Sequence, residues 1–262
     1  MNIFVCVKQV PDTETKVTPN SDQSFIETQS IKWILNPYDE FAVEQALLIK
    51  AANSESNVTV LRVGSVKDTE ALRTAMAMGA DDAVLVEAED NLDSYSIAKA
   101  LKGAIDKTGK KPDLILTGKQ AIDDDCLQVP QILAQMLNLP SVSVVVGMDY
   151  ESGKITAKRE IDGGSIEVYE LNTPGIIACN KGLNTPRYAS LPGIMKAKKK
   201  PLTQMSLADA GVSDSDRKVK YFDFHLPPEK PAGKKFEATE KADAEKAVSE
   251  VVQLLRNEAK VI

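Results

Sequence analysis

The sequence predicts an α/β protein built on a doubly wound, mostly parallel sheet with helices on both faces. As far as Met148, short apolar runs rich in branched residues alternate with longer segments of helical spacing. After Met148 the pattern changes to two strand-like segments around an Asp-Gly-Gly turn, which predicts an appended β-hairpin. The last part of the chain, from about Leu202, has the composition of an extended arm that ends in a helix.

The predicted strands of the parallel sheet are short apolar runs, which is typical of strands buried on both faces. They are Ile3–Val7, Val58–Val63, Ala83–Val86, Leu114–Thr117 and Val142–Met148, and a further buried strand, Gly175–Cys179, follows the hairpin.

The predicted helices lie between these strands, at Tyr38–Ala52, Thr69–Met78, Ser94–Lys107 and from about Leu127 to Leu137. In the last of them, one buried face is indicated by apolar residues at the spacing i, i+3, i+4, i+7, i+8, namely Val129, Ile132, Leu133, Met136 and Leu137. Because parallel strands are joined by right-handed crossovers, helices are expected to cover both faces of the sheet.

Two domains are expected. The first, 1–201, includes the hairpin 154–171, whose strands Lys154–Glu160 and Ser165–Leu171 flank the turn, and an exposed loop at 184–200. The second, 202–262, is rich in Pro, Lys, Asp and Ser, and regains helical periodicity only at Ala244–Asn257. Because so few apolar residues cannot offset the entropy of ordering the chain, this arm is expected to be disordered or wrapped on a partner.

Composition excludes several classes of function. A net charge of −6 argues against nucleic-acid binding, which needs a basic surface. Three widely spaced cysteines, Cys6, Cys126 and Cys179, indicate neither a disulfide framework nor a metal site. No apolar run approaches the ~20 residues that span a bilayer, and the N-terminus lacks a signal pattern, so a cytoplasmic protein is expected.

Catalytic residues are not evident either. His225 is the only histidine and lies in the Pro-rich arm without an apparent partner acid or nucleophile. Trp33 stands in a short strand-like stretch, where a packing role is expected.

A nucleotide pocket is predicted where three strands end and helices begin, because ligands of doubly wound sheets lie at the carboxyl ends of the strands. In the first such segment Asn36 is a suitable N-cap, Pro37 suits the first helical position, and Asp39 stands where a capping box has its acidic residue. Taken singly, each segment has an equally good structural explanation as a helix cap or a tight turn. The candidate residues are Cys6, Asn36, Pro37, Tyr38, Asp39, Val63, Asp123, Asp124, Asp125, Cys126, Leu127, Gln128, Val129, Pro130 and Gln131.

The three consecutive aspartates of this set pose an electrostatic problem, since carboxylates facing a phosphate would repel it. We expect main-chain N–H groups and side chains such as Gln128 to meet the anion, with the carboxylates capping the helix or binding ribose hydroxyls. Cys126 is expected to be inert, because the same aspartates disfavour a thiolate.

A docking surface is predicted around Leu191, whose backbone is restricted by Pro192. An exposed apolar side chain on a stiffened loop can insert into a partner's pocket at small entropic cost. The alternative is that Leu191 folds back onto the protein's own core. Tyr188, Ile194, Met195, Lys196 and Lys198 complete the candidate surface, with the lysines steering acidic partners.

The chain closely resembles the electron transfer flavoprotein beta subunit. The family's turn signature is matched in register by Arg159, Asp162, Gly163, Gly164, Glu167, Pro174 and Ile176–Cys179, and further matching segments run from Ile3 through the lysine run near residue 200. The resemblance implies an adenine-nucleotide-binding fold with a structural AMP in this subunit and no catalytic residues of its own. It also implies a heterodimer in which FAD is held mainly by the alpha subunit, which the C-terminal arm would wrap.

The resemblance further implies a carrier that accepts electrons from acyl-CoA dehydrogenases and related flavoproteins in fatty acid β-oxidation and passes them to a membrane quinone oxidoreductase. Leu191 corresponds to the family's recognition anchor, and Arg159 and Glu160 are expected to contact the mobile flavin domain.

Three other interpretations stay open. The segments Val7–Thr13 and Asn36–Asp39 look like those of electron-bifurcating relatives, in which a second FAD fills the AMP pocket. AMP is favoured because those relatives carry Gly-Asp-Thr where this chain has Asp124-Asp125-Cys126, and because they lack the Arg-Glu-Ile-Asp-Gly-Gly turn. A free-standing stress-type nucleotide-binding protein would not require the hairpin, the loop or the arm. An ATP pyrophosphatase would need a glycine-rich phosphate loop, which is not visible in the sequence.

Overall fold

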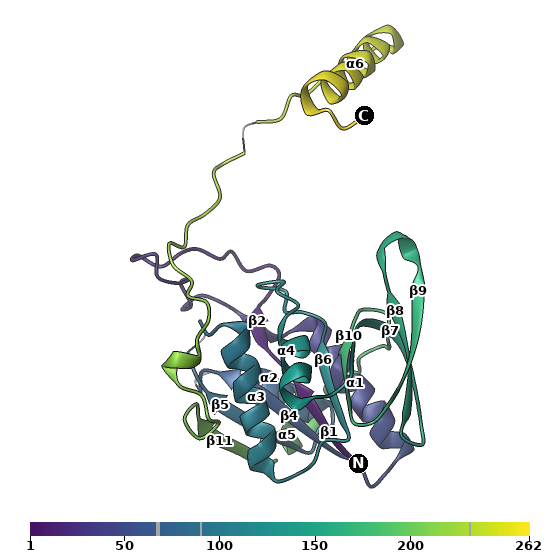
Figure 1. Ribbon diagram of the computed structural model, residues 1–262. Helices are drawn as coiled ribbons and strands as arrows, with labels where there is room; N and C mark the ends of the chain where they lie inside the picture. The colour runs from purple at the N-terminus through teal and green to yellow at the C-terminus, as the bar shows by residue number, and fades with distance from the viewer. Residues whose placement is uncertain (67–68, 90, 231) are drawn as a thin grey trace. The chain divides into compact units, whose positions relative to one another are not determined.

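The computed structural model describes residues 1–66, 69–89, 91–230 and 232–262 (Figure 1). The chain divides into two compact units, Met1–His225 and Leu226–Ile262. The second unit contains helix α6 (Lys241–Leu254), which continues into a π-helical turn at Leu255–Ala259. The first unit contains the other helices and strands, and all site residues discussed below belong to it.

Nine strands of the described residues form one sheet in the order β11-β5-β4-β1-β6-β10-β7-β8-β9. Neighbours from β11 to β7 are parallel, and β7, β8 and β9 are antiparallel to one another in turn. This confirms the predicted mostly parallel sheet. The strands are β1 (Asn2–Cys6), β4 (Asn57–Gly64), β5 (Asp82–Glu87), β6 (Leu114–Gly118), β7 (Ser141–Glu151), β8 (Lys154–Glu160), β9 (Ile166–Asn172), β10 (Gly175–Cys179) and β11 (Leu202–Ser206).

Helices cover both faces of the sheet, as predicted. On β1, Ile3 and Val5 face one apolar cluster, whereas Phe4 and Cys6 face the other, which is the two-residue period of a strand buried on both sides. Helices α1 (Pro37–Ala52), α2 (Glu70–Met78) and α5 (Leu191–Ala197) contribute to the first cluster. Helices α3 (Ser94–Thr108) and α4 (Val129–Leu137) contribute to the second.

The predicted hairpin is part of the main sheet and forms its antiparallel edge. β8 pairs with β7 on one side and with β9 on the other, so Ile155 and Ala157 are fully buried. The turn after β8 places Gly163 and Gly164 at φ 78° and 76°, a region that side chains other than glycine rarely adopt. Figure 1 shows this long hairpin rising beyond the other strands of the first unit.

The C-terminal arm begins later than the sequence indicates. Residues 202–206 form β11, which pairs in parallel with β5 at the edge of the sheet. Ala210 and Val212 are buried in the same apolar cluster as α3. Leu202 and Met205 are half-buried on opposite faces of the sheet. One apolar residue on each face is enough for an edge strand that packs on a preformed sheet, and so weak a pattern does not predict a strand from sequence. The separation into units therefore falls after His225 and not at 201.

A second, two-stranded sheet pairs β2 (Gln9–Pro11) with β3 (Trp33–Leu35) in antiparallel fashion. It closes the base of the long loop 12–32 and delivers the chain directly to the start of α1. Short strands of this kind fix where the two ends of a loop lie, so the loop 12–32 stays beside the carboxyl end of β1.

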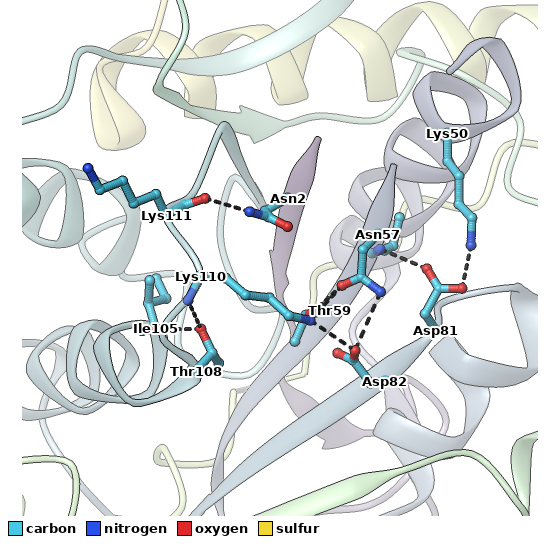
Figure 2. Close-up of polar contacts among 11 residues, drawn as sticks. Asn2, Lys50, Asn57, Thr59, Asp81, Asp82, Ile105, Thr108, Lys110 and Lys111 are labelled. Atoms are coloured by element: carbon cyan, nitrogen blue, oxygen red, sulfur yellow. Dashed lines mark hydrogen bonds and ion pairs between the residues drawn. The ribbon is translucent and has the colours of Figure 1, made fainter. Parts of the chain in front are cut away.

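The amino-terminal edge of the parallel strands is closed by charged side chains (Figure 2). Asp81 pairs with Lys50 and accepts the backbone N–H of Val58 at 2.8 Å. Lys110 Nζ lies 3.2 Å from Asp82 Oδ2 and 2.9 Å from Asn57 Oδ1. These contacts join the end of α1, the start of β4 and β5, and the connection after α3.

Candidate nucleotide site and docking surface

A cavity of about 760 Å³ lies at the carboxyl ends of β1, β4 and β6. Cys6, Val63 and Gly118, the last residues or near-last residues of these strands, line it. The chain passes from β1 to β4 and β5 on one side and then crosses to β6 and β10 on the other. The cavity is therefore at the topological switch point of the sheet, where open α/β folds bind their ligands.

Most of the predicted pocket residues are brought together in this cavity. Those that line it are Cys6, Asn36, Asp39, Val63, Asp123, Asp124, Cys126, Leu127, Gln128, Val129 and Pro130. Pro37, Tyr38, Asp125 and Gln131 do not line it. Tyr38 instead packs beneath Lys119, whose Nζ is 5.1 Å from the ring centroid, and Asp125 accepts a hydrogen bond from Gln120.

Asn36 has a different structural role from the predicted one. It occupies the N-cap position of α1, but its side chain makes no capping hydrogen bond. Its Nδ2 donates to the carbonyl of Gln120 at 2.9 Å, and its Oδ1 accepts the N–H of Ile122 at 3.3 Å. The buried amide thus ties the start of α1 to the loop after β6, a long-range contact that local sequence cannot reveal.

Asp39 is also not part of a capping box. Its Oδ2 accepts the N–H of Lys8 at 2.6 Å, and its Oδ1 accepts the N–H of Gly118 at 3.0 Å, so one carboxylate joins the ends of β1 and β6. Burial raises the pKa of Asp39 to about 7 and outweighs the opposing effect of the two N–H donors. Gly118 is required by the same contact, because a Cβ there would lie 2.3 Å from Asp39 Oδ1.

Lys8 resolves the electrostatic problem of the aspartates. Its Nζ lies 2.8 Å from Asp123 Oδ1 and 3.0 Å from Asp124 Oδ2, and it lines the cavity. Burial lowers the pKa of Lys8, but the two carboxylates outweigh this effect and the net shift is upward. Lys8 was not among the predicted pocket residues, although a lone lysine directly after a buried strand and an Asp triplet after a neighbouring strand are a signal for such pairing.

Burial disfavours the thiolate form of the two thiols beside the cavity. Burial raises the pKa of Cys6 strongly, and partial burial together with Asp124 raises that of Cys126. Only the thiolate is reactive, and that Cys126 is inert stays a prediction.

Aromatic residues from two distant segments complete the cavity wall and were not predicted to do so. Phe25 and Trp33 come from the first long loop and β3, and Tyr221 and Phe224 come from the segment after β11. Trp33, for which a packing role was expected, lines the cavity. Aromatic residues inside polar segments are the only sequence signal for this wall.

The predicted docking residues are exposed. The exposed fraction is 98% for Tyr188, 75% for Leu191 and 60% for Met195. Leu191 does not lie in a loop but begins α5, because Ser190 caps the helix by accepting the N–H of Gly193 at 3.1 Å. Pro192, Ile194, Lys196 and Lys198 are also exposed on or beside this helix.

The segment before α5 is anchored to α1. Arg187 Nε and Nη2 donate to the two carboxylate oxygens of Glu44 at 2.7 and 2.8 Å, and the Glu44 side chain is only 5% exposed. Asn184 Nδ2 donates to the carbonyl of Phe41 at 3.0 Å. Bidentate pairs of this kind fix geometry as well as contribute energy, so the exposed residues stand on a rigid support.

Arg159 and Glu160 are held within the hairpin region. Arg159 Nη1 lies 3.8 Å from Glu167 Oε2 of the paired strand β9, and Glu160 Oε2 accepts from Asn180 Nδ2 at 3.3 Å. Arg159 is half-buried and Glu160 is exposed.

The fold and the cavity define a class: an α/β domain with a cavity at the switch point of a parallel sheet, where such folds bind small ligands. In the part of the chain that the structure describes, no group of His, Cys, Asp and Glu side chains is arranged to hold a metal ion. Likewise, none of the described helices has both the length and the apolar character needed to cross a membrane.

Comparison with known proteins identifies the family. Residues 24–210 match the electron transfer flavoprotein domain. The chain is 40% identical to the electron transfer flavoprotein subunit beta of Bacillus subtilis, over 100% of both chains. It is 40% identical to that of Syntrophomonas wolfei, over 100% of this chain and 98% of the relative, and 37% identical to the human subunit, over 92% and 94%. The chain therefore belongs to the electron transfer flavoprotein family, as a homologue of its beta subunits.

Proposed function

We propose that this protein is the beta subunit of a heterodimeric electron carrier. An alpha subunit would hold the FAD, and the complex would accept electrons from acyl-CoA dehydrogenases and related flavoproteins of fatty acid β-oxidation. It would pass them to a membrane quinone oxidoreductase. The beta subunit would supply no proton-transfer or nucleophilic group. Its arm, from Leu202 as the sequence predicts or from Leu226 where the second unit begins, would wrap the alpha subunit.

The observation that carries the ligand assignment is the cavity at the switch point. Its volume of about 760 Å³ is within the usual range of roughly 300–1,000 Å³ for small-molecule sites. We propose that it holds a structural AMP, with main-chain N–H groups of the loop after β6 and the start of α4 meeting the phosphate. Lys8 would offset two of the three nearby carboxylates.

A second FAD in place of AMP is the alternative that one observation favours. The cavity continues past the strand ends to Asp12, Thr13 and the aromatic wall, so it offers more room than the predicted loops alone enclose. The two assignments predict different flavin counts: one flavin per heterodimer if AMP fills the cavity, and two if FAD fills it.

The test is to denature the purified heterodimer and to identify and count the nucleotides released. One AMP and one FAD per heterodimer are expected. Two FAD molecules would replace the AMP assignment by the bifurcating one. A colourless protein isolated without a second chain would instead support the stress-type interpretation.

Docking of the electron donor is proposed to rest on Leu191 and its exposed neighbours. Leu191→Ala should slow electron transfer from an acyl-CoA dehydrogenase about tenfold or more, because truncation of a hot-spot anchor costs ~2 kcal/mol or more and ~1.4 kcal/mol corresponds to a factor of ten. Flavin content should not change. Leu48→Ala is the matched control, since Leu48 is an exposed leucine of α1, and it should leave the rate unaltered. An unchanged rate in Leu191→Ala would refute the anchor.

Arg159 and Glu160 are proposed to contact the mobile flavin domain. Arg159 already pairs with Glu167 across the hairpin. A contact with the flavin domain would therefore require Arg159 to leave Glu167, so that contact would be transient and not a fixed salt bridge.

A further inference from the structure

One wall of the cavity is built differently from the others. Residues 217–224, which we call the strap, have no regular secondary structure, and Tyr221 and Phe224 line the cavity from it. Apart from the loop 12–32, the other walls are strand ends, helix starts and the connections between them. The outer side of the strap is exposed: Phe222 is 77% and Val219 is 49% accessible. Segments with so little buried apolar surface are the ones that open at low cost in free energy.

The strap is fastened at its beginning by a single buried carboxylate. Asp93, which is 1% exposed, accepts the backbone N–H groups of Lys218 and Val219 with Oδ2 at 2.7 and 3.0 Å. Its other oxygen, Oδ1, caps α3 by accepting the N–H of Ser96 at 3.0 Å. The Arg217 guanidinium adds a bond of 2.7 Å to the carbonyl of Asn91.

The strap is fastened at its end to the loop 12–32. Phe224 donates its N–H to the carbonyl of Gln23 at 2.9 Å, and its ring meets that of Phe25 edge to face at 5.6 Å between centroids. The strap and the loop thus hold each other while both face the cavity. The chain continues from the strap into the second unit, which begins at Leu226.

We propose that the strap is a movable cover of the cavity and that Asp93 is its latch. The ligand enters and leaves when the Asp93–strap hydrogen bonds break, so Asp93 controls the rate of ligand exchange without touching the ligand. Asp93 is a positioning residue in this scheme. The proposal rests on the proposed function for the identity of the ligand, AMP, but not for the motion of the cover.

Asp93→Ser separates the two roles of this side chain. Serine is a good N-cap and can still accept from Ser96, but it has no second oxygen to reach the strap. Because hydrogen bonds to a charged acceptor are lost, release of bound AMP into excess unlabelled AMP should become about tenfold faster or more. Asp209→Ser is the matched control, since Asp209 bonds only within its own turn, to Ser206, and should leave the rate unchanged.

A second measurement needs no nucleotide. Trp33 is the only tryptophan of the chain and lines the cavity, so quenching of its fluorescence by acrylamide in the full-length chain reports access to the cavity. Quenching should be faster in Asp93→Ser and in Phe224→Ala, which releases the other end of the strap. Phe224→Ala also provides the test if Asp93→Ser fails to fold.

The outcomes distinguish the two proposals. Unchanged AMP release and unchanged Trp33 quenching in folded Asp93→Ser and Phe224→Ala would overturn the latch. If the wild-type protein holds no AMP, the ligand assignment fails, but Trp33 quenching still tests the strap. Faster quenching in the variants supports a movable strap, and equal quenching overturns it.

Discussion

The two edges of the central sheet use charged side chains in opposite ways. At the amino edge, Asp81 and Asp82 pair with their lysine partners, and none of these residues lines the cavity (Figure 2). At the carboxyl edge, Asp39 and Lys8 are equally engaged but stand around an open space. Pairing alone therefore does not mark a functional site. What marks it is that the paired groups belong to strand ends at the switch point.

The largest expected difference between the edges is in the dependence of stability on pH. The pKa of Asp39 in the folded protein, about 7, is above its ordinary value, so the folded state holds this proton more tightly. The protonated Asp39 carboxyl therefore stabilises the folded state fully below the ordinary pKa of an aspartate, and this contribution is lost as pH rises through 7. Between pH 4 and pH 8, the free energy of unfolding should fall by on the order of 3 kcal/mol more in wild type than in Asp39→Asn.

Urea unfolding at the two pH values measures this difference. If the free energy of unfolding changes equally with pH in wild type and in Asp39→Asn, the Asp39 carboxyl makes no such contribution to stability.

Gly118→Ala should break the carboxyl edge itself. The new Cβ would lie 2.3 Å from Asp39 Oδ1 and 2.9 Å from the main-chain carbon of Tyr38, so backbone has to move. We expect a loss of about 3 kcal/mol in stability and loss of the bound nucleotide. Gly233→Ala is the control, because a Cβ there has nothing within 4 Å, and it should cost little. Nucleotide retained at full stoichiometry in Gly118→Ala would contradict the site.

Asp81→Asn should weaken the amino edge and spare the carboxyl edge. An amide has one acceptor oxygen, so either the N–H of Val58 or Lys50 loses its partner. The expected loss is about 2 kcal/mol by thermal or urea unfolding, with nucleotide content unchanged. Loss of nucleotide in this variant would mean that the two edges are coupled.

The smallest effect is expected for Lys110→Met. The lysine side chain is 37% exposed, and pairs near the surface contribute about 1 kcal/mol or less. Its stability should therefore change little, and the change should shrink in high salt. A loss as large as that of Asp81→Asn would show that the amino edge acts as one network.

Local sequence predicted the elements whose burial is periodic. The apolar run of β1 and the regularly spaced apolar face of α4 can be recognised from a short stretch of sequence, because burial recurs along each element with a fixed period. The family signature in the hairpin predicted the turn. These features placed the sheet and its switch point, and they brought most of the predicted pocket residues to the cavity.

What the sequence did not predict depends on distant partners. Asn36 has the local signature of a cap but bonds to the loop after β6, and β11 is a strand only because β5 offers it an edge. Tyr221 and Phe224 lie in a segment too polar to suggest a cavity wall, and the backbone just before them is hydrogen-bonded to the distant Asp93. Such contacts are set by tertiary structure, which no local pattern encodes.

The start of α5 has a consequence for how a partner would recognise this protein. Leu191, Ile194 and Met195 are spaced i, i+3 and i+4, so they form one ridge along a short helix and not a lone projecting point. A partner would contact such a ridge along its whole length. A donor that fits the proposed surface would lose most affinity when Leu191 is truncated, and it would also respond to a change in the orientation of the helix, whose preceding segment is anchored to α1 by the pair of Arg187 and Glu44.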